Sequence, residues 1–596
     1  MADWKGWLRR LLGGRGQENE PGVQTLDITL LAFAVGIGLL AALGALAFRS
    51  LIELFQLLFW SSGASFTEQV IASPWWLRLG VPVLGGLIAG PVITFLVPEA
   101  KGPGVPEVIV SVTSLQSTIR HRVTFLKGLV TSLLLGTGAS VGREGPIVQI
   151  GASVGSSLAQ LFGMRPELRR LCLACGAAAG ISATFNAPIA GSLFAMEIIL
   201  MNIEVSFISH IVVASITGSV LARIFWGQFP VFEVMPFFLL SNWELGIYLC
   251  LGLVSGLAAI CFVRLIFGLD SAFSKLPLPE WLKPAVGGLG LGLMALQLPE
   301  VLGVGYETVN AALTESLGLG LALVLLGAKL LATSLCIGSG MSGGIFAPSL
   351  FLGAMLGTAV GLAATAVLPD LAVSPAFFAL AGMGAMVSGT TLAPITAIVT
   401  IFELTLQYQI ILPLMLTCIS ATVVVRFLFG YSAYEMKLLR RGINIVRGHD
   451  VGILRNLMVR DFMRRGYTAV REDTPLQELY EHLAESAYPH FVVLNASDEL
   501  SGVISLRDVR KVLPRFEELK ESLTAGELMT REVVTLKERD HLETALHVFE
   551  RNSFSFVPVL SDSGPLRVEG IMTKDDLLTA YDQKVLKDRV LSCPMS

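Results

Sequence analysis

The chain has 596 residues, of which 53% are hydrophobic and only 15% carry a charge. A soluble globular protein has about 25% charged residues, so the composition excludes a protein that is soluble along its whole length. The net charge of −4 and the lack of a long basic tract argue against a nucleic-acid partner. Of the 90 charged residues, 49 lie from Tyr431 onward. We therefore expect a large membrane domain followed by a smaller soluble one.

Residues 1–26 are expected to form a cytoplasmic amphipathic segment rather than a signal peptide. Basic residues between Lys5 and Arg15 are interspersed with Trp and Leu, a pattern typical of a helix on a membrane surface. The apolar run from Ile28 to Phe48 can span the bilayer, since a crossing takes about 20 apolar residues. Positive charges before this run favour a cytoplasmic N-terminus. The soluble tail is also expected in the cytoplasm. The protein as a whole is expected in a prokaryotic plasma (inner) membrane.

Several apolar runs are too short to be ordinary membrane-spanning helices. Gly128–Val141 and Ile147–Phe162 are separated by Gly142-Arg-Glu-Gly-Pro146, and Gly343-Gly-Ile-Phe-Ala-Pro348 interrupts a later pair. The 60 glycines and 27 prolines likewise indicate helices that stop and restart inside the bilayer. Such breaks are tolerated only where the freed backbone lines a cavity or is buried in protein. The pattern indicates a transporter or a channel rather than a membrane anchor.

The membrane domain also contains an internal repeat. The segment from Lys127 to Gly142 aligns with the segment from Lys329 to Gly344 at an offset of 202 residues, and a later block aligns at an offset of 206. Two aligned blocks predict an all-α domain of two inverted repeats, with a substrate site at their interface near the bilayer midplane. The matched pairs include Pro146 with Pro348, Gly176 with Gly382, Pro188 with Pro394, and Glu197 with Glu403.

Three loops rich in glycine and proline each open a helix, and these helices are expected to begin at Glu107, Ile147 and Ser349. The loops are Gly102-Pro-Gly-Val-Pro106, Gly142-Arg-Glu-Gly-Pro146 and Gly343-Gly-Ile-Phe-Ala-Pro348. Proline suits the first turn of a helix, where its missing N–H costs nothing. The free amides and the positive dipole end of a helix favour anions. One such loop could be an ordinary junction, but three in one membrane domain predict an anion-binding centre. The amides of Ile345 and Phe346, supported by a hydroxyl, are expected to hold the ion without a full positive charge.

Glu144 is the carboxylate expected to compete with that anion. A carboxylate within the membrane costs about 2.5–3.5 kcal/mol on insertion scales, so Glu144 is a functional candidate. When ionised, it is itself an anion that can occupy the pathway, and when protonated it loses its charge and leaves. This competition predicts a proton-controlled gate. The alternative is a carboxylate paired with Arg143 at the rim of the pathway.

The three loops resemble the anion-pathway motifs of the CLC chloride channels and proton-coupled exchangers. Ser432-Ala-Tyr-Glu-Met-Lys-Leu-Leu-Arg-Arg441 resembles the terminal helix of that family, whose tyrosine contacts the central anion. The resemblance covers residues 27–445 and implies a homodimer with one pore in each subunit. It implies that Glu144 is the outer gating glutamate. The residues it implies for the anion are Pro103, Gly104, Arg143, Gly145, Ile345, Phe346 and Tyr434.

Two positions depart from the family pattern. Pro103 stands where serine is common, which removes a hydroxyl, and in plant relatives a proline here goes with a preference for nitrate. Glu197 matches the first of two adjacent glutamates found in many exchangers, but Ile198 stands where the second serves as inner proton acceptor. Glu197 is therefore the candidate for an inner proton path. Some exchangers of the family lack the second glutamate, so we expect exchange of chloride or nitrate for protons.

The tail from Val459 has short strands and amphipathic helices in two similar halves, which indicates α/β units. It resembles a tandem pair of CBS domains, expected at 457–513 and 520–585 after a linker at 446–456. Such pairs often bind adenine nucleotides (ATP, ADP or AMP), with a hydroxyl and a carboxylate on the ribose. The alternative is that these carboxylates only cap helices. The matching pairs are Ser505 with Asp508 and Thr573 with Asp576.

Three rival functions stay open. The first is a passive voltage- or proton-gated chloride channel of the same fold. The second is a CBS-regulated divalent-cation transporter, which would need several pore-facing carboxylates. The third is a serine hydrolase, because Ser153 lies in a G-x-S-x-G sequence and His210 follows in a later apolar run. We expect a transporter rather than an enzyme, with no metal site and no required cofactor.

Overall fold

A computed structural model describes residues 23–113, 117–201, 205–227, 232, 243–369, 374–441, 443, 457–485, 490–513, 516–551, 556–561, 566–577 and 579–580. The chain divides into two compact units, a membrane unit at 1–443 and a tail unit at 444–596. The amphipathic helix expected before Val23 and the linker expected at 446–456 lie outside the described residues.

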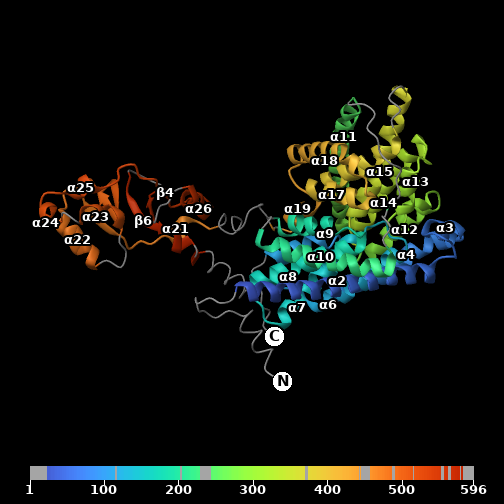
Figure 1. Ribbon diagram of the computed structural model, residues 1–596, viewed down its shortest axis with the longest axis horizontal. Helices are drawn as coiled ribbons and strands as arrows, with labels where there is room; N and C mark the ends of the chain where they lie inside the picture. The colour runs from blue at the N-terminus through green and yellow to red at the C-terminus, as the bar shows by residue number, and fades with distance from the viewer. Residues whose placement is uncertain are drawn as a thin grey trace, which may run out of the picture. The chain divides into compact units, whose positions relative to one another are not determined.

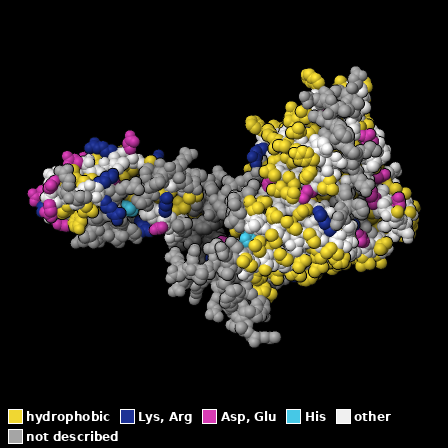
Figure 2. All heavy atoms as spheres, viewed as in Figure 1, with side chains coloured by type: hydrophobic (Ala, Val, Ile, Leu, Met, Phe, Trp, Pro, Cys, Tyr) yellow, Lys and Arg dark blue, Asp and Glu magenta, His cyan; other side chains and the backbone are white. Residues whose placement is uncertain are grey.

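The membrane unit is a bundle of helices (Figure 1). Seven of the described helices are long and apolar enough to cross a membrane. Figure 2 shows hydrophobic side chains spread over the visible face of this unit, and Phe427, for example, is 90% exposed. Such a large apolar surface is typical of a protein that contacts lipid. The spans contain α2 (Val23–Phe59), α4 (Trp75–Pro91), α10 (Val205–Trp226), α11 (Glu244–Lys275), α14 (Leu319–Gly338), α15 (Phe346–Val367) and α18 (Ile411–Leu428).

Shorter helices lie between these spans, as the broken apolar runs predict. For instance, α6 ends at Gly136 and α7 begins at Glu144, so the chain between them is not helical. The shorter α-helices are α3 (Phe66–Ala72), α5 (Val105–Thr113), α6 (His121–Gly136), α7 (Glu144–Leu161), α8 (Pro166–Phe185), α9 (Pro188–Phe194), α12 (Lys283–Ala295), α13 (Tyr306–Leu313), α16 (Pro375–Thr391), α17 (Pro394–Thr405) and α19 (Ala433–Arg440).

The three helices after the glycine-rich loops begin earlier than expected. Helix α5 begins at Val105, α7 at Glu144 and α15 at Phe346, so each proline lies inside the first turn. The first four amides of a helix have no partner within it, so a proline anywhere in the first turn removes no hydrogen bond. Glu144 and Phe346 are therefore the first residues of α7 and α15.

The two repeats predicted from the sequence are confirmed by equivalent contacts. Thr131 Oγ1 lies 2.7 Å from Ser342 Oγ, and the matched residues Thr333 and Ser140 make the same hydroxyl contact at 3.2 Å. Each contact therefore joins one repeat to the other. The helix pairs α7–α8 and α15–α16 also pack through matched glycines. A Cβ on Gly151 would lie 2.1 Å from the Gly176 carbonyl oxygen, and one on Gly353 would lie 2.2 Å from that of Gly382.

The tail unit contains two three-stranded sheets of the same topology. The first strand of each sheet is parallel to the second, and the second is antiparallel to the third. The strands are β1 (Thr468–Arg471), β2 (His490–Leu494) and β3 (Leu500–Ser505), then β4 (Leu536–Lys537), β5 (Phe556–Leu560) and β6 (Val568–Thr573). The helices of at least seven residues are α22 (Leu476–Glu485), α23 (Leu506–Val512) and α26 (Leu542–Arg551).

The two halves of the tail also exchange backbone contacts. Arg464, from the first half, pairs with Ile571 of β6, and Thr530, from the second half, pairs with Val503 of β3. This reciprocal pairing holds the two halves in one unit.

Candidate functional site

The loops before α7 and α15 are joined directly through their backbones. The Gly142 N–H donates to the Gly344 carbonyl at 2.7 Å, and the Gly344 N–H donates back to Gly142 at 2.7 Å. The first loop reaches the same place, because the Gly343 N–H donates to the Gly102 carbonyl at 3.3 Å. The pairing brings the amino ends of α5, α7 and α15 together in the interior of the membrane unit.

Close packing around Gly145 fixes the first loop against α7. A Cβ on Gly145 would lie 2.0 Å from the Pro103 carbonyl oxygen and 3.1 Å from the Gly344 Cα. Gly104 has a φ of +86°, and a Cβ on it would lie 3.0 Å from the Gly145 carbonyl oxygen. A left-handed conformation of this kind favours glycine. The glycines predicted as part of the anion site therefore allow the three loops to meet.

Glu144 lies at this junction and is almost fully buried, with 1% of its surface exposed. Its Oε2 accepts a hydrogen bond of 3.3 Å from the Ala347 amide in the first turn of α15. Its Oε1 accepts one of 2.9 Å from the Tyr306 hydroxyl at the start of α13. A carboxylate on the amino end of a helix is held by the free amides and by the helix dipole.

The alternative pairing of Glu144 with Arg143 is not found. Among the described residues, no ion pair within 4.0 Å joins the two side chains. The Arg143 guanidinium lies instead over the ring of Tyr306, 5.1 Å from its centroid. Tyr306 and Ala347 were both absent from the residues predicted for the site.

The remaining predicted anion residues are near the same loops and are buried. Ile345 is 1% exposed, Phe346 2% and Tyr434 2%. The Phe346 ring packs against Phe185, with 5.7 Å between ring centroids. Tyr434 is near the start of α19, whose first turn is closed by a capping box between Ser432 and Glu435.

A cavity of about 310 Å³ opens beside these loops. Gly102, Pro103, Ile345 and Ala433 form part of its lining. Four of its other lining residues are basic and one is acidic: Lys101, Lys437, Arg440 and Arg441, with Asp270. These four cations are paired with three carboxylates, those of Glu280, Glu107 and Asp270, so one positive charge is in excess. An excess of positive charge in a concave surface raises the local concentration of anions.

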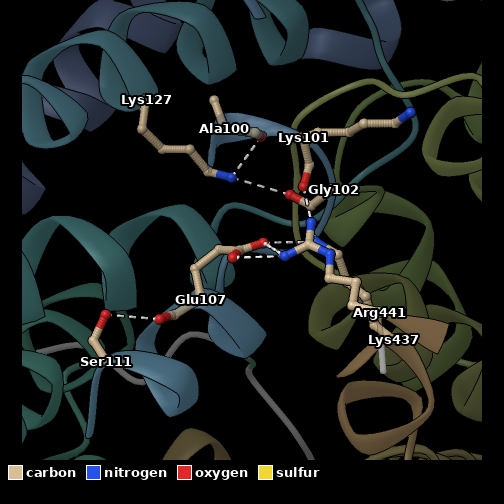
Figure 3. Close-up of polar contacts among 8 residues, drawn as sticks. All are labelled: Ala100, Lys101, Gly102, Glu107, Ser111, Lys127, Lys437 and Arg441. Atoms are coloured by element: carbon tan, nitrogen blue, oxygen red, sulfur yellow. Dashed lines mark hydrogen bonds and ion pairs between the residues drawn. The ribbon is translucent and has the colours of Figure 1, made fainter. Parts of the chain in front are cut away.

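Figure 3 shows how the first loop is tied to α5, α6 and α19. Lys127 is fully buried, and its Nζ donates to the carbonyls of Ala100 at 2.7 Å and Gly102 at 3.1 Å. The Glu107 carboxylate accepts from Lys437 at 3.1 Å and from Arg441 at 2.8 Å. The Lys437 Nζ also donates to the Lys101 carbonyl at 2.8 Å. These contacts fix the loop that carries Pro103 and Gly104.

Glu197, the candidate for an inner proton path, caps a helix of the other repeat. Its Oε2 accepts hydrogen bonds of 2.7 Å from both the amide and the hydroxyl of Thr396, at the start of α17. Glu403 does the same for α9, accepting from the Ala190 amide at 2.6 Å. These matched glutamates therefore make reciprocal contacts across the two repeats. The neighbouring Ile198 is buried, at 4% exposure.

Both hydroxyl–carboxylate pairs of the tail are formed. Ser505 Oγ donates to Asp508 Oδ2 at 2.7 Å, and Thr573 Oγ1 donates to Asp576 Oδ2 at 2.7 Å. The aspartates accept from the backbone amides of the same two residues, so both also act as helix caps. Burial raises the pKa of Asp508, but hydrogen bonds from Ser505 and Lys511 outweigh it and leave that pKa below its usual value.

The serine proposed for a hydrolase lies in the wrong setting. Ser153 is inside α7 rather than on a turn after a strand, and its hydroxyl is hydrogen-bonded to Thr124. His210 belongs to α10. The G-x-S-x-G sequence is therefore part of the close packing of α7 against α8 and is not a nucleophile elbow.

Two repeats of broken helices, whose amino ends meet around a buried carboxylate, define a membrane transport protein of the inverted-repeat class. The chain belongs to the CLC family: residues 85–426 match the family model described as "voltage gated chloride channel". Two further matches, at 459–515 and 525–583, are to the CBS domain. The family membership confirms the predicted fold and argues against a cation transporter.

Curated relatives align with most of the membrane unit. A putative chloride channel protein, ClcB-like, from Ralstonia nicotianae is 38% identical over 425 residues, which are 70% of this chain and 98% of the relative. The H(+)/Cl(−) exchange transporter ClcA of Citrobacter koseri is 36% identical, over 69% of this chain and 89% of the relative.

Two solved structures share the fold. A slow cyanobacterial Cl−/H+ antiporter matches with a TM-score of 0.64 and 27% identity, over 70% of this chain and 98% of the other. A eukaryotic CLC transporter matches with a TM-score of 0.63 over 92% of this chain and 98% of the other. At 21% identity, the second likeness concerns the fold alone.

Proposed function

We propose that this protein exchanges small anions, chloride or nitrate, for protons across the membrane, with Glu144 as the gate. The observation that carries the proposal is the position of the Glu144 carboxylate, 3.3 Å from the Ala347 amide where the three loops meet. Relatives named as H+/Cl− exchangers support the choice of exchange over a passive channel.

The geometry supports a competition between the carboxylate and the transported ion. Ionised Glu144 occupies the amino end of α15 and excludes an anion from it. A proton removes its charge, so the side chain leaves and a small anion takes its place on the amides of Ile345, Phe346 and Ala347. The basic cavity beside Pro103 supplies anions from one side. Repeated exchange of the two occupants moves anions and protons in opposite directions.

At the inner end of the proton path, Ile198 stands where many exchangers have a glutamate. Ile198 cannot carry a proton, and Glu197 already accepts hydrogen bonds from Thr396. We infer that water carries the proton past this region. Glu197→Gln is therefore expected to leave proton coupling in place. A loss of chloride-driven proton transport in this variant would instead show that Glu197 is an inner proton acceptor and not only a helix cap.

Proton transport driven by an anion gradient tests the proposal. Purified protein in liposomes is exposed to an outward chloride gradient with no initial pH difference, and internal pH is recorded with a dye. An exchanger moves protons into the liposomes as chloride leaves, even against a proton gradient. Chloride efflux without any proton movement would instead identify a passive channel of the same fold.

Pro103→Ser is expected to shift selectivity from nitrate toward chloride. The substitution restores a hydroxyl beside the paired loops, and a hydrogen bond to an ion contributes about 1.5–3 kcal/mol. The nitrate-to-chloride permeability ratio should therefore fall by about tenfold. Reversal potentials with each anion measure the ratio, and equal ratios in the two proteins would reject a role for Pro103 in selectivity.

We also propose that the protein is a homodimer with one pathway in each subunit, placed in a prokaryotic inner membrane with both termini in the cytoplasm. The family membership supports this arrangement. The mass of the purified protein in detergent tests the dimer, and the accessibility of a cysteine placed in the tail tests the orientation. A monomeric mass would contradict the homodimer. Labelling of the tail from outside intact cells would contradict a cytoplasmic C-terminus.

For the tail we propose a regulatory adenine nucleotide held by the two hydroxyl–carboxylate pairs. Their equivalent geometry after β3 and β6 supports this, although the same contacts serve as caps. A bound nucleotide stabilises the protein by about 2.7 kcal/mol at 100 times its dissociation constant. ATP, ADP or AMP should therefore raise the unfolding temperature of the tail. The double variant Asp508→Asn, Asp576→Asn should lose the effect, and no shift with any of the three would overturn the proposal.

A further inference from the structure

The start of α13 occupies the place in the second repeat that the first anion loop occupies in the first. Gly102 and Gly104 match Gly303 and Gly305 at an offset of 201 residues, and all four have positive φ values, of 77°, 86°, 59° and 84°. Lys127 donates to the carbonyl of Gly102, and its match Lys329 donates to that of Gly303 at 2.8 Å. The segment that ends at Tyr306 is therefore a second, repeat-related approach to the site.

Tyr306 is held rigidly at this position. It is the first residue of α13, and its ring meets Phe232 edge to face, with 5.5 Å between centroids and 80° between planes. The Arg143 guanidinium lies 5.1 Å from the centre of the same ring. With its ring fixed by both contacts, the hydroxyl can point in few directions, and it donates to Glu144 Oε1 at 2.9 Å.

We propose that Tyr306 is a positioning residue that holds the ionised Glu144 side chain in the anion pathway and so sets the pH at which the gate opens. The inference rests on the proposed function, because it gives Glu144 its gating role. A hydrogen bond to an ionised carboxylate is about twice as strong as one to a neutral group. The Tyr306 hydroxyl therefore favours the closed, ionised state over the protonated state in which an anion takes the site.

Other groups that act on Glu144 would remain when the hydroxyl is removed. Among the described residues, the charged group beside it is Arg143, on the residue before α7, and the other titratable group is Tyr434, on α19. Tyr306→Phe leaves both side chains in place and keeps the ring between Phe232 and Arg143, and the interactions it removes are those of the hydroxyl with Glu144 and with Arg143. The substitution therefore isolates the hydroxyl.

The first test is the pH dependence of chloride flux through Tyr306→Phe in liposomes. We expect the midpoint to move upward by about one pH unit, the tenfold change expected from loss of a charge-assisted hydrogen bond. Proton coupling should persist, because Glu144 is still present. Tyr248→Phe is the matched control, since Tyr248 is 1% exposed and stacks on Phe378, with 4.3 Å between centroids, outside the site. An unchanged midpoint in Tyr306→Phe, or an equal shift in the control, would overturn the inference.

A second measurement keeps the inference testable if the flux of the variant is low. Chloride affinity is measured by calorimetry for Tyr306→Phe alone and in a Glu144→Gln background. We expect affinity to rise about tenfold in the first case and to change little in the second, where no ionised carboxylate competes. An equal change in both backgrounds would mean that Tyr306 acts on the anion directly and would reject the inference. The proposed function fails separately, if the unmodified protein moves chloride without protons.

Discussion

Replacing Glu144 with glutamine is expected to abolish proton transport while chloride flux continues. The amide has the shape of a protonated carboxyl group but cannot release or take up a proton. It also lacks the charge that keeps the ionised side chain at the amino end of α15. The pathway should therefore stay open to anions at every pH. Proton uptake driven by a chloride gradient measures the loss, and chloride efflux from the same liposomes measures what is retained.

Glu403→Gln is the matched control for that experiment. Glu403 is also a carboxylate of the membrane unit that accepts from the amino end of a helix, with 2.6 Å between its Oε2 and the Ala190 amide. Glu403 caps the amino end of α9 and not that of α15, so proton coupling should survive the change. Undiminished proton transport in Glu144→Gln would remove Glu144 from the mechanism, and an equal loss in both variants would point to damage to the fold.

Gly145→Ala is expected to reduce chloride flux by about tenfold or more. The new methyl group would lie 2.0 Å from the Pro103 carbonyl oxygen, which belongs to a loop tied down by Lys127 and Lys437. Neither backbone can yield easily, so the first loop is forced away from the ends of α7 and α15. Overpacking of this kind costs about 1–3 kcal/mol, and here the cost falls on the geometry of the anion site.

Chloride efflux and the elution profile of the purified variant are measured together for Gly145→Ala. Gly80→Ala in α4 is the control, because a Cβ at Gly80 meets nothing within 4 Å and alanine is the better helix former. We expect the control to keep its flux and its unfolding temperature. Normal flux in a well-folded Gly145→Ala protein would contradict the close packing of the three loops.

The repeat and its three helix ends could be predicted from the sequence because both leave local signals. Glycine and proline mark the broken helices, and the matched lysines, prolines and glutamates lie at two constant offsets. The prolines lie in the first turns of α5, α7 and α15, as expected, but these helices begin before the expected residues, since the sequence does not show which residue of a first turn carries the proline.

The partners of Glu144 could not be predicted, because they come from parts of the chain far from it. Tyr306 follows Gly303-Val-Gly305, which lacks the prolines of the first loop, and its match to Gly102-Pro-Gly104 lies at an offset of 201 rather than 202. The positive φ values of the four glycines and the equivalent contacts of Lys127 and Lys329 reveal the relation. In the sequence, the match of the two glycine pairs, one residue short of the main offset, was the signal that could have found it.

The capping role of Glu197 has a similar explanation. Its match to Glu403 was visible in the sequence, but each glutamate caps the helix that begins at the matched proline of the other repeat. A sequence pattern can show that two residues are equivalent. It cannot show that their side chains cross the interface between repeats, which depends on how α9 and α17 pack.

Whether Glu144 and the transported anion share one site can be measured by anomalous scattering from bromide in crystals of the unmodified protein and of Glu144→Gln. We expect bromide in the variant to occupy the place near the Ala347 amide that the carboxylate fills in the unmodified protein. In the unmodified protein no bromide should be found there at neutral pH. Bromide at that place beside an unmoved, ionised Glu144, or none between the ends of α7 and α15 in either crystal, would contradict a shared site.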